Sequence, residues 1–173
     1  LPVVIVTGSG NQGITASVPV IRYAKHIGAS DERLYRALLV SDLVTIHQKT
    51  GIGRLSAYCG AVSAGCGAGA GIAYLLGGDY RAIAHTIVNA VAILSGTICD
   101  GAKPSCAAKI ASAVEAGILG YYMYVNDQQF RGGDGIVAKG VENTIRNVGL
   151  LASQGMKQTD RVILNIMTGD QCL

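Results

Sequence analysis

Apolar residues recur every three or four positions through most of the chain, and this spacing predicts helices. The pattern is clearest after Ser30, an N-cap residue type that precedes two acidic residues, Asp31 and Glu32, in the first turn. The apolar positions then follow at helical spacing: Leu34, Leu38, Leu39, Leu43 and Ile46. Gly51 and Gly53 end the pattern, because glycine commonly terminates helices. We therefore expect a helix between Ser30 and these glycines.

The same spacing predicts further helices on both sides of this segment. They cover residues 14–26, 79–94, 106–119, 136–153 and 159–167. Residues 2–7 are interpreted as a short extended segment, and residues 130–135 as a polar glycine turn. No later segment shows the sustained alternation of a strand. We therefore predict a single, mainly α domain over residues 1–173, a compact helical domain with a short extended segment at the N-terminus.

The stretch from residue 55 to residue 78 contains no charged side chain and is crowded with glycine and alanine. Its length requires a transmembrane helix to be considered. Membrane insertion is driven by leucine, isoleucine and phenylalanine rather than by glycine, and the next apolar segment contains His85 and Asn89. We therefore interpret the stretch as a central Gly/Ala-rich helix that is buried by closely packed neighbours.

The composition narrows the classes of function. Apolar residues make up 50% of the 173 residues and charged residues 14%, which excludes a disordered chain. The net charge of +3 is not gathered into a basic run, so nothing supports nucleic-acid binding. With 24 glycines, one phenylalanine and no tryptophan, the core is expected to consist of small side chains together with Leu, Ile, Val and Tyr.

The five cysteines and the start of the chain lead to two expectations. An odd number of cysteines with no hydrophobic leader before them argues against a secreted disulfide framework and favours a reducing cytoplasm. The chain also opens on a strand-like apolar run rather than on methionine. We expect from this opening a fragment, or one chain of a processed or split protein, that associates with the missing part or with itself.

Four of the cysteines form two equally spaced pairs with different surroundings. Cys59 and Cys66 lie in the predicted central helix, where seven residues rise about 10 Å, so at most one of them can reach a given compact metal centre. Cys99 and Cys106 flank a segment with glycine and proline, which interrupts the helix and lets both sulfurs fold onto one site. The spacing thus allows three thiolates to converge, one from a helix and two from a loop.

Three converging cysteines leave three interpretations open. A 4Fe-4S cluster whose fourth iron keeps an open position uses three thiolates, whereas electron-transfer clusters use four. A zinc site would need a fourth ligand such as His85, and the close cysteine pairs of structural zinc sites are absent. Alternatively, the cysteines are small hydrophobic residues in a glycine and alanine core. His26, His47 and His85 are expected on helix faces rather than in a site.

A glycine-rich turn at residues 8–13 precedes the first predicted helix. Its sequence matches neither a dinucleotide-binding motif nor a Walker motif. It does place free backbone N–H groups and the side chains of Ser9, Asn11 and Gln12 near a helix N-terminus, which is a suitable cradle for a carboxylate. The alternative is an ordinary helix-entry turn.

Three segments with distinctive sequences follow one another in a characteristic order. They are Gly-Ser-Gly-Asn-Gln-Gly at 8–13, Tyr-Cys-Gly-Ala-Val-Ser-Ala-Gly-Cys-Gly-Ala-Gly at 58–69, and Ile-Cys-Asp-Gly-Ala-Lys-Pro-Ser-Cys-Ala at 98–107. This order resembles the serine dehydratase α-chain family, and within it the branch that contains the L-cysteine desulfidases and many uncharacterised bacterial proteins. The resemblance covers about residues 1–168 and corresponds to the C-terminal part of the family's usual chain.

The resemblance implies a cytoplasmic lyase with a 4Fe-4S cluster. Cys66 lies outside the implied ligand set, which is Cys59, Cys99 and Cys106. Asp100 is implied to lie beside the cluster, and the implied substrate-binding residues are Ser9, Asn11, Gln12 and Lys103. No catalytic residue is assigned within this chain, because the family's N-terminal portion is expected to complete the pocket and supply the proton-abstracting base.

The implied reaction is β-elimination of L-cysteine or L-serine to pyruvate and ammonia, with sulfide released from cysteine. The expected partners are the amino-acid substrate and the missing N-terminal half or a second chain, or further copies in a homo-oligomer, with neither nucleic acid nor membrane. No pyridoxal phosphate is expected, since no local motif identifies a Schiff-base lysine. The alternative function is a non-catalytic helical partner or scaffold domain whose cysteines are structural.

Overall fold

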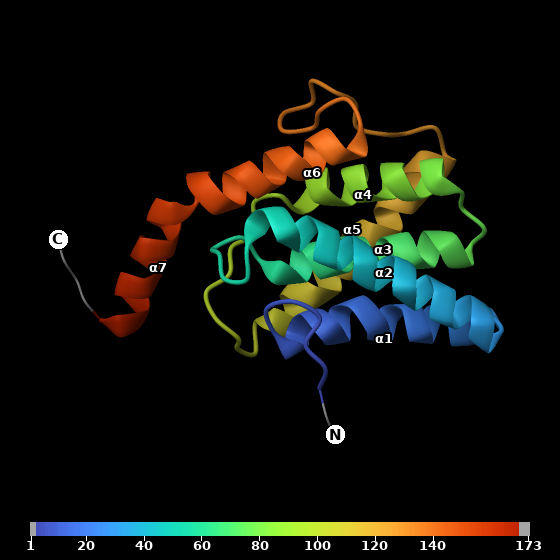
Figure 1. Cartoon of the computed structure of the whole chain (residues 1–173), viewed down its shortest axis with the longest axis horizontal. Coiled ribbons are helices and arrows are strands. Elements are labelled where there is room, and N and C mark those ends of the chain that lie inside the picture. The colour runs from blue at the N-terminus through green and yellow to red at the C-terminus, as the bar shows by residue number, and fades with distance from the viewer. Residues whose placement is uncertain (1–2, 170–173) are drawn as a thin grey trace.

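Within residues 3–169, which the structure describes, the chain folds into seven α-helices and one π-helical turn, as Figure 1 shows for the computed structural model. The α-helices are α1 (Gly10–His26), α2 (Asp31–Ile52), α3 (Gly60–Leu75), α4 (Tyr80–Leu94), α5 (Cys106–Val125), α6 (Val141–Leu150) and α7 (Lys157–Thr168), and the π-helical turn η1 (Leu151–Gly155) joins the last two. This part of the chain contains no strand. The predicted mainly α domain is therefore confirmed.

The predicted extended segment at the N-terminus does not form a strand. Pro2 lies outside the described residues, and residues 3–9 run as irregular backbone with bends. The carbonyl of Val4 lies directly against Gly13 in the first turn of α1, where a side chain would not fit. The segment thus crosses a helix and has no neighbouring strand with which to pair. The side chains of Val3, Val4 and Ile5 are exposed, as expected of an apolar segment that this chain does not cover.

Helix α2 begins and ends where the sequence indicates, but the face that it buries is not the face that carries most of its large apolar residues. The Ser30 hydroxyl accepts a hydrogen bond from the backbone N–H of Arg33, and Gly53 ends the helix with a φ of +93°. Leu39 and Leu43 are exposed. Apart from Ile52, the buried face carries smaller or polar side chains instead: Ala37, Ser41, Thr45, Gln48 and Lys49. Small residues are needed there because the backbone of α3 lies so close.

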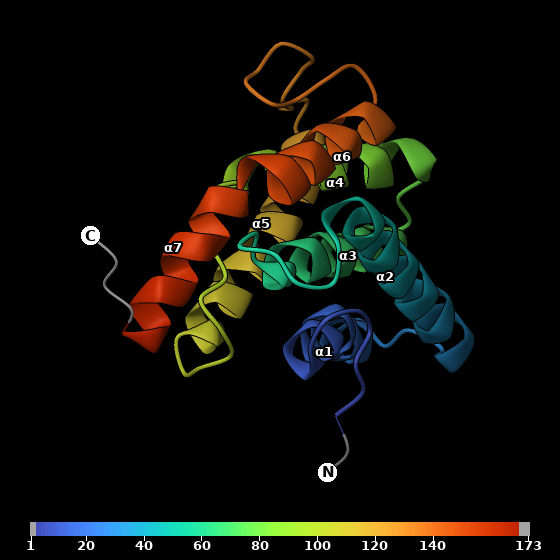
Figure 2. The same cartoon turned by 60° about the vertical axis from the view of Figure 1, so that its left-hand side comes forward.

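The glycine- and alanine-rich stretch forms α3, the buried centre of the domain. It contacts α1, α2, α4 and α5, which surround it in Figures 1 and 2. A Cβ atom on Gly67 would lie 2.5 Å from the carbonyl oxygen of Ser41, and one on Gly65 would lie 2.5 Å from the carbonyl of Ala113. The predicted central buried helix is confirmed. None of the helices within residues 3–169 combines the length and apolar character that a membrane span needs.

Helix α5 continues past its predicted end at residue 119. Gly120 does not stop it, because this glycine is a packing position: a Cβ atom there would lie 2.8 Å from the carbonyl oxygen of Thr86. The carbonyl of Gly120 also accepts a hydrogen bond of 2.9 Å from the buried amide of Asn89 on α4. The helix therefore extends through the tyrosine cluster to Val125.

The predicted helix over residues 136–153 is divided into a loop, α6 and η1. Residues before Gly140 stay in the loop because Thr144 Oγ1 hydrogen-bonds both backbone groups of Ala138, and Gly140 itself has a φ of +89°. After η1, α7 projects away from the helices around α3 (Figure 1). In the described part of the chain α7 contacts no other helical element than η1, and it buries none of its residues.

Candidate functional site

A cavity of about 180 Å³ opens between the start of α1, the start of α3 and the segment that leads into α5. Six of the residues that the sequence singled out line it: Ser9, Asn11, Gln12, Cys59, Cys99 and Cys106. They come from three segments far apart in the sequence. The structure therefore brings the predicted cysteine ligands and the predicted substrate loop to the same cavity.

Backbone pairing holds the first two of these cysteines side by side. Tyr58 and Ile98 form an isolated antiparallel bridge. Next to it, the N–H of Cys59 donates to the carbonyl of Thr97 at 3.1 Å, and the N–H of Cys99 donates to the carbonyl of Ala57 at 2.6 Å. Cys59 is also the N-cap residue of α3. The loop after α4 is thus fixed against the entrance of the central helix.

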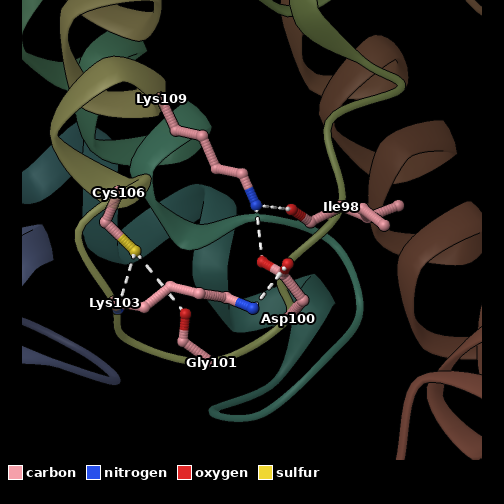
Figure 3. A network of polar contacts seen from close by, with 6 residues as sticks. All are labelled: Ile98, Asp100, Gly101, Lys103, Cys106 and Lys109. Carbon is pink, nitrogen blue, oxygen red and sulfur yellow. Dashed lines mark hydrogen bonds and ion pairs between the residues drawn. The ribbon is translucent and has the colours of Figure 1, made fainter. Parts of the chain in front are cut away.

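Cys106, the third predicted ligand, is the first residue of α5 and is enclosed by its own loop. Its Sγ accepts a hydrogen bond from the backbone N–H of Lys103 at 3.4 Å and donates to the carbonyl of Gly101 at 3.5 Å (Figure 3). Gly101 adopts a φ of +92°, which favours glycine and turns the loop back over the sulfur. The predicted interruption of the helix therefore forms the loop that folds back over the sulfur of Cys106.

Two lysines, Lys49 and Lys109, interact electrostatically with the three thiols. Burial raises the pKa of the Cys59 thiol, while the backbone N–H groups of Ala61 and Val62 and the charge of Lys109 act in the opposite direction. Lys109 also interacts electrostatically with Cys106, and Lys49 with both Cys59 and Cys99. Negative charge on these sulfurs would therefore be stabilised by Lys49 and, to a smaller extent, by Lys109, which also pairs with Asp100.

Cys66 lies away from this cavity. It is fully buried on α3 and does not line the cavity. Burial raises the pKa of its thiol to about 12, so this sulfur is a neutral thiol at physiological pH. Cys66 behaves as a small hydrophobic residue of the core.

The glycine-rich segment is partly helix. Helix α1 begins at Gly10, with Ser9 as its N-cap, so Asn11 and Gln12 lie in its first turn. Gln12 is buried, and its amide oxygen accepts hydrogen bonds from Thr7 Oγ1 and, at 3.4 Å, from the N–H of Gly8. Its side chain lies so close to Gly60 that a Cβ there would overlap it. The predicted cradle is thus the first turn of a helix whose N-cap side chain makes no capping hydrogen bond.

Asp100 joins two lysines into a network at the edge of the cavity. Figure 3 shows its carboxylate between Lys109, at 2.6 Å, and Lys103, at 2.9 Å. Lys109 also donates to the carbonyl of Ile98 at 3.0 Å. Hydrogen bonds from Lys109, and secondarily from Lys103, hold the pKa of Asp100 well below its usual range, and Asp100 in turn raises the pKa of Lys109. Lys103 itself does not line the cavity.

We expect Lys109→Met to raise the pKa of Asp100 more than Lys103→Met does, because Lys109 is the stronger of its two partners. Since the folded-state pKa is lowered, the network is intact at neutral pH and is lost as the pH falls through the folded pKa. NMR titration of the side-chain carboxyl measures both variants. Equal shifts in the two variants would contradict the ranking of the lysines.

Three cationic residues that line this cavity were not predicted from the sequence: Lys49, Arg54 and Lys109. Lys49 is 5% exposed, and its ammonium has no hydrogen bond or ion pair within the described part of the chain. Desolvation lowers its pKa. One signal in the sequence could have shown that Lys49 is buried. Lys49 follows Thr45 by one helical turn, so both lie on the face of α2 that packs against α3.

The arrangement of the thiols bears on which group they could hold. Within residues 3–169, no three His, Cys, Asp or Glu side chains are gathered closely enough to bind a single metal ion. The zinc alternative also lacks its expected fourth ligand, because His85 does not line this cavity. Three thiols that line one cavity, with two lysines near them, are a donor set of the kind that an anionic group such as an iron-sulfur cluster requires.

The three histidines lie on helix faces, as expected, and none of them lines the cavity. His47 pairs with Glu142 at 2.8 Å, His26 packs edge-to-face with Tyr23, and His85 stacks on Tyr124 with ring centroids 5.0 Å apart. Each imidazole thus has a partner away from the cysteines.

Comparison with known proteins places this chain in a family. A UPF0597 protein of Desulfitobacterium hafniense is 69% identical to it over 172 residues, which is 99% of this chain and 40% of that protein. A UPF0597 protein of Lachnoclostridium phytofermentans is 55% identical over 96% of this chain, which covers 40% of that protein. A UPF0597 protein of Treponema denticola is 52% identical over 98% of this chain, which covers 39% of that protein. No solved structure matches.

The chain thus spans about 40% of the length of the curated relatives it matches. The family model described as serine dehydratase alpha chain matches residues 1–165, which is nearly all of it. The chain therefore belongs to the serine dehydratase alpha chain family.

Proposed function

We propose that this chain is the cluster-binding part of an enzyme that eliminates the β substituent of L-cysteine or L-serine. The observation that carries the proposal is the single cavity lined both by Cys59, Cys99 and Cys106 and by the first turn of α1. Family membership supports it, because the serine dehydratase name describes this chemistry for serine. The remainder of a longer chain, or a second chain, would complete the site.

The reaction breaks the Cα–H bond and the Cβ–S or Cβ–O bond of the amino acid. A base takes the α proton, and the leaving group departs as sulfide or water. The resulting aminoacrylate takes up water to give pyruvate and ammonia. A 4Fe-4S cluster held by the three cysteines would supply an iron that acts as a Lewis acid. This chain offers no assigned base, which is proposed to come from the rest of the protein.

Lys49 is the residue that we propose to bind the substrate carboxylate. Of the two lysines that line the cavity, Lys109 is already neutralised by Asp100 at 2.6 Å, whereas Lys49 has no carboxylate partner within the described residues. Its surroundings are desolvated, so an ion pair formed there would be stronger than one in water. The uncapped start of α1, with Ser9 and Asn11, would provide further hydrogen-bond donors to the same carboxylate.

A fusion protein tests the proposed activity. This chain replaces the matching 40% of the Desulfitobacterium hafniense protein, and the fusion is reconstituted anaerobically with iron and sulfide. We expect pyruvate from L-cysteine or L-serine, and a comparison of kcat/KM for the two identifies the substrate. A fusion that binds iron without forming pyruvate from either amino acid would contradict the proposal. A folded fusion without iron would favour a non-catalytic scaffold with structural cysteines.

We expect Lys49→Met to lower kcat/KM of this fusion by about 10- to 100-fold, because a charge-assisted bond to the substrate is lost. The same change should raise the free energy of unfolding by about 1 kcal/mol at neutral pH, since it removes a desolvated charge. The lowered pKa of Lys49 means that this gain shrinks as the pH rises toward the ordinary lysine value. Enzyme kinetics and chemical denaturation at several pH values measure the two effects.

The exposed Lys157 on α7 supplies the matched control. Lys157→Met removes the same charge outside the cavity and should change neither kcat/KM nor stability appreciably. Unchanged kinetics in the Lys49→Met fusion would exclude Lys49 from substrate binding.

A further inference from the structure

A second cavity, of about 550 Å³, lies between the first half of α4, the loop over residues 129–140 and the start of α6. The loop arches over α4 and α6 at the top of Figure 1. This cavity shares no lining residue with the cysteine cavity. Its volume lies within the range of about 300–1,000 Å³ that is usual for small-molecule sites. The function proposed above does not use it.

The charged side chains that line this cavity are cationic. Arg81 comes from α4, and Arg131 and Lys139 come from the two ends of the loop. No hydrogen bond or ion pair of these three side chains is found within residues 3–169, and no acidic residue lines the cavity. Three exposed cationic residues thus line one cavity that has no acidic lining residue, and such a cavity favours an anion with more than one negative charge.

The nearby carboxylates have other partners. Asp79 caps α4 by accepting from the N–H of Ala82 at 2.8 Å, and Asp134 accepts from the backbone N–H of Arg131 at 2.6 Å. Glu142 pairs with His47 at 2.8 Å. None of these three carboxylates lines the cavity. None of these carboxylates forms an ion pair with a cation of the cavity within residues 3–169.

The rest of the cavity wall is apolar or neutral. Val88, Val137 and Val141 contribute aliphatic surface, and Tyr80 and Phe130 contribute aromatic rings. Such a wall does not suit an inorganic ion alone, whose hydration it could not replace. A ligand that combines a multiply charged group with an organic body would satisfy both the cations and the wall.

We propose that this cavity binds a small organic phosphate. A phosphate ester supplies two negative charges and three acceptor oxygens to Arg81, Arg131 and Lys139, and its organic part contacts the valines and aromatic rings. Because the cations belong to α4 and to the loop, the bound ester would join the two. The inference is independent of the proposed lyase activity.

Isothermal titration calorimetry of the chain tests this with three organic probes and two controls. The organic probes are adenosine 5′-monophosphate, glucose 6-phosphate and glycerol 3-phosphate, and the controls are inorganic phosphate and adenosine. We expect at least one ester to bind saturably, and at least ten times more tightly than either control. The absence of saturable binding by all three esters would overturn the proposal, as would equal affinity for inorganic phosphate or for adenosine.

Charge-matched variants locate the site. The double variant Arg81→Gln/Arg131→Gln should weaken binding of the best ester by about 100-fold, and Lys139→Gln alone by about 10-fold. Arg22→Gln/Lys25→Gln removes two exposed charges from α1 and should change the affinity by less than twofold. Circular dichroism shows whether each variant is folded. If the double variant unfolds, the affinity of the Lys139→Gln variant still tests the site. Unchanged affinity in folded cavity variants would exclude this cavity as the site.

Discussion

Each of the substitutions Cys59→Ser, Cys99→Ser and Cys106→Ser is expected to abolish iron binding in the anaerobically reconstituted fusion. The unsubstituted protein should take up about four iron and four sulfide per chain. A serine hydroxyl is a poor replacement for a thiolate ligand, and each of the three thiols faces the same cavity from a different backbone position. Iron and sulfide analysis, together with the visible absorption of the cluster, measures the loss.

Cys66→Ser is the matched control for this experiment. Cys66 is fully buried in the core of α3 and does not line the cavity, so the variant should retain the cluster. It should lose about 1–3 kcal/mol of stability, because a hydroxyl replaces a small hydrophobic group in the core. Loss of the cluster from Cys66→Ser with retention in Cys59→Ser would reverse the ligand assignment. If none of the proteins binds iron, the cluster itself is excluded under these conditions.

The second large effect is expected at Gly69, where α3 meets α5. A Cβ atom on Gly69 would lie 2.6 Å from Gly117 Cα and 2.8 Å from its carbonyl oxygen. These are backbone atoms of a packed helix, so neither partner can yield without moving a whole element. We expect Gly69→Ala to lower the free energy of unfolding by about 2–3 kcal/mol, although alanine is the better helix former by about 1 kcal/mol. Thermal and chemical denaturation measure this.

Gly96→Ala serves as the control for Gly69→Ala. Gly96 follows α4, and a Cβ atom added there meets nothing within 4 Å. The variant should therefore keep its stability within about 0.5 kcal/mol. Similar stabilities of Gly69→Ala and Gly96→Ala would mean that α3 and α5 do not approach as closely as described.

Much of the fold could be predicted because its signals are local. Ser30 caps α2, Gly53 ends it, and the uncharged glycine-rich stretch forms the buried α3. The errors arise where local signals compete with packing. Gly120 continues α5, since its missing side chain allows a contact with α4. Residues 136–140 stay out of α6, because Thr144 bonds the loop backbone.

The site shows the same division. Three cysteines and the start of α1 could be named from their order in the sequence, and the structure brings them to one cavity. Lys49 could not be assigned in this way, because its sequence neighbours do not show that it faces the thiols. The pairing of Asp100 with Lys109, nine positions later, likewise depends on how the loop folds against the start of α5.

The sequence by itself determined the helical class, the start and end of α2, the buried central helix and the identity of the thiol-bearing positions. Each of these follows from residue spacing, from the conformational preferences of glycine, serine and proline, or from the order of three motifs. The tertiary structure alone decided which face of α2 is buried, which lysines lie near the sulfurs, and that Arg81, Arg131 and Lys139 line one cavity. These features depend on contacts between segments that are distant in the sequence, such as the close packing of small side chains between α2 and α3, and no local pattern encodes such contacts.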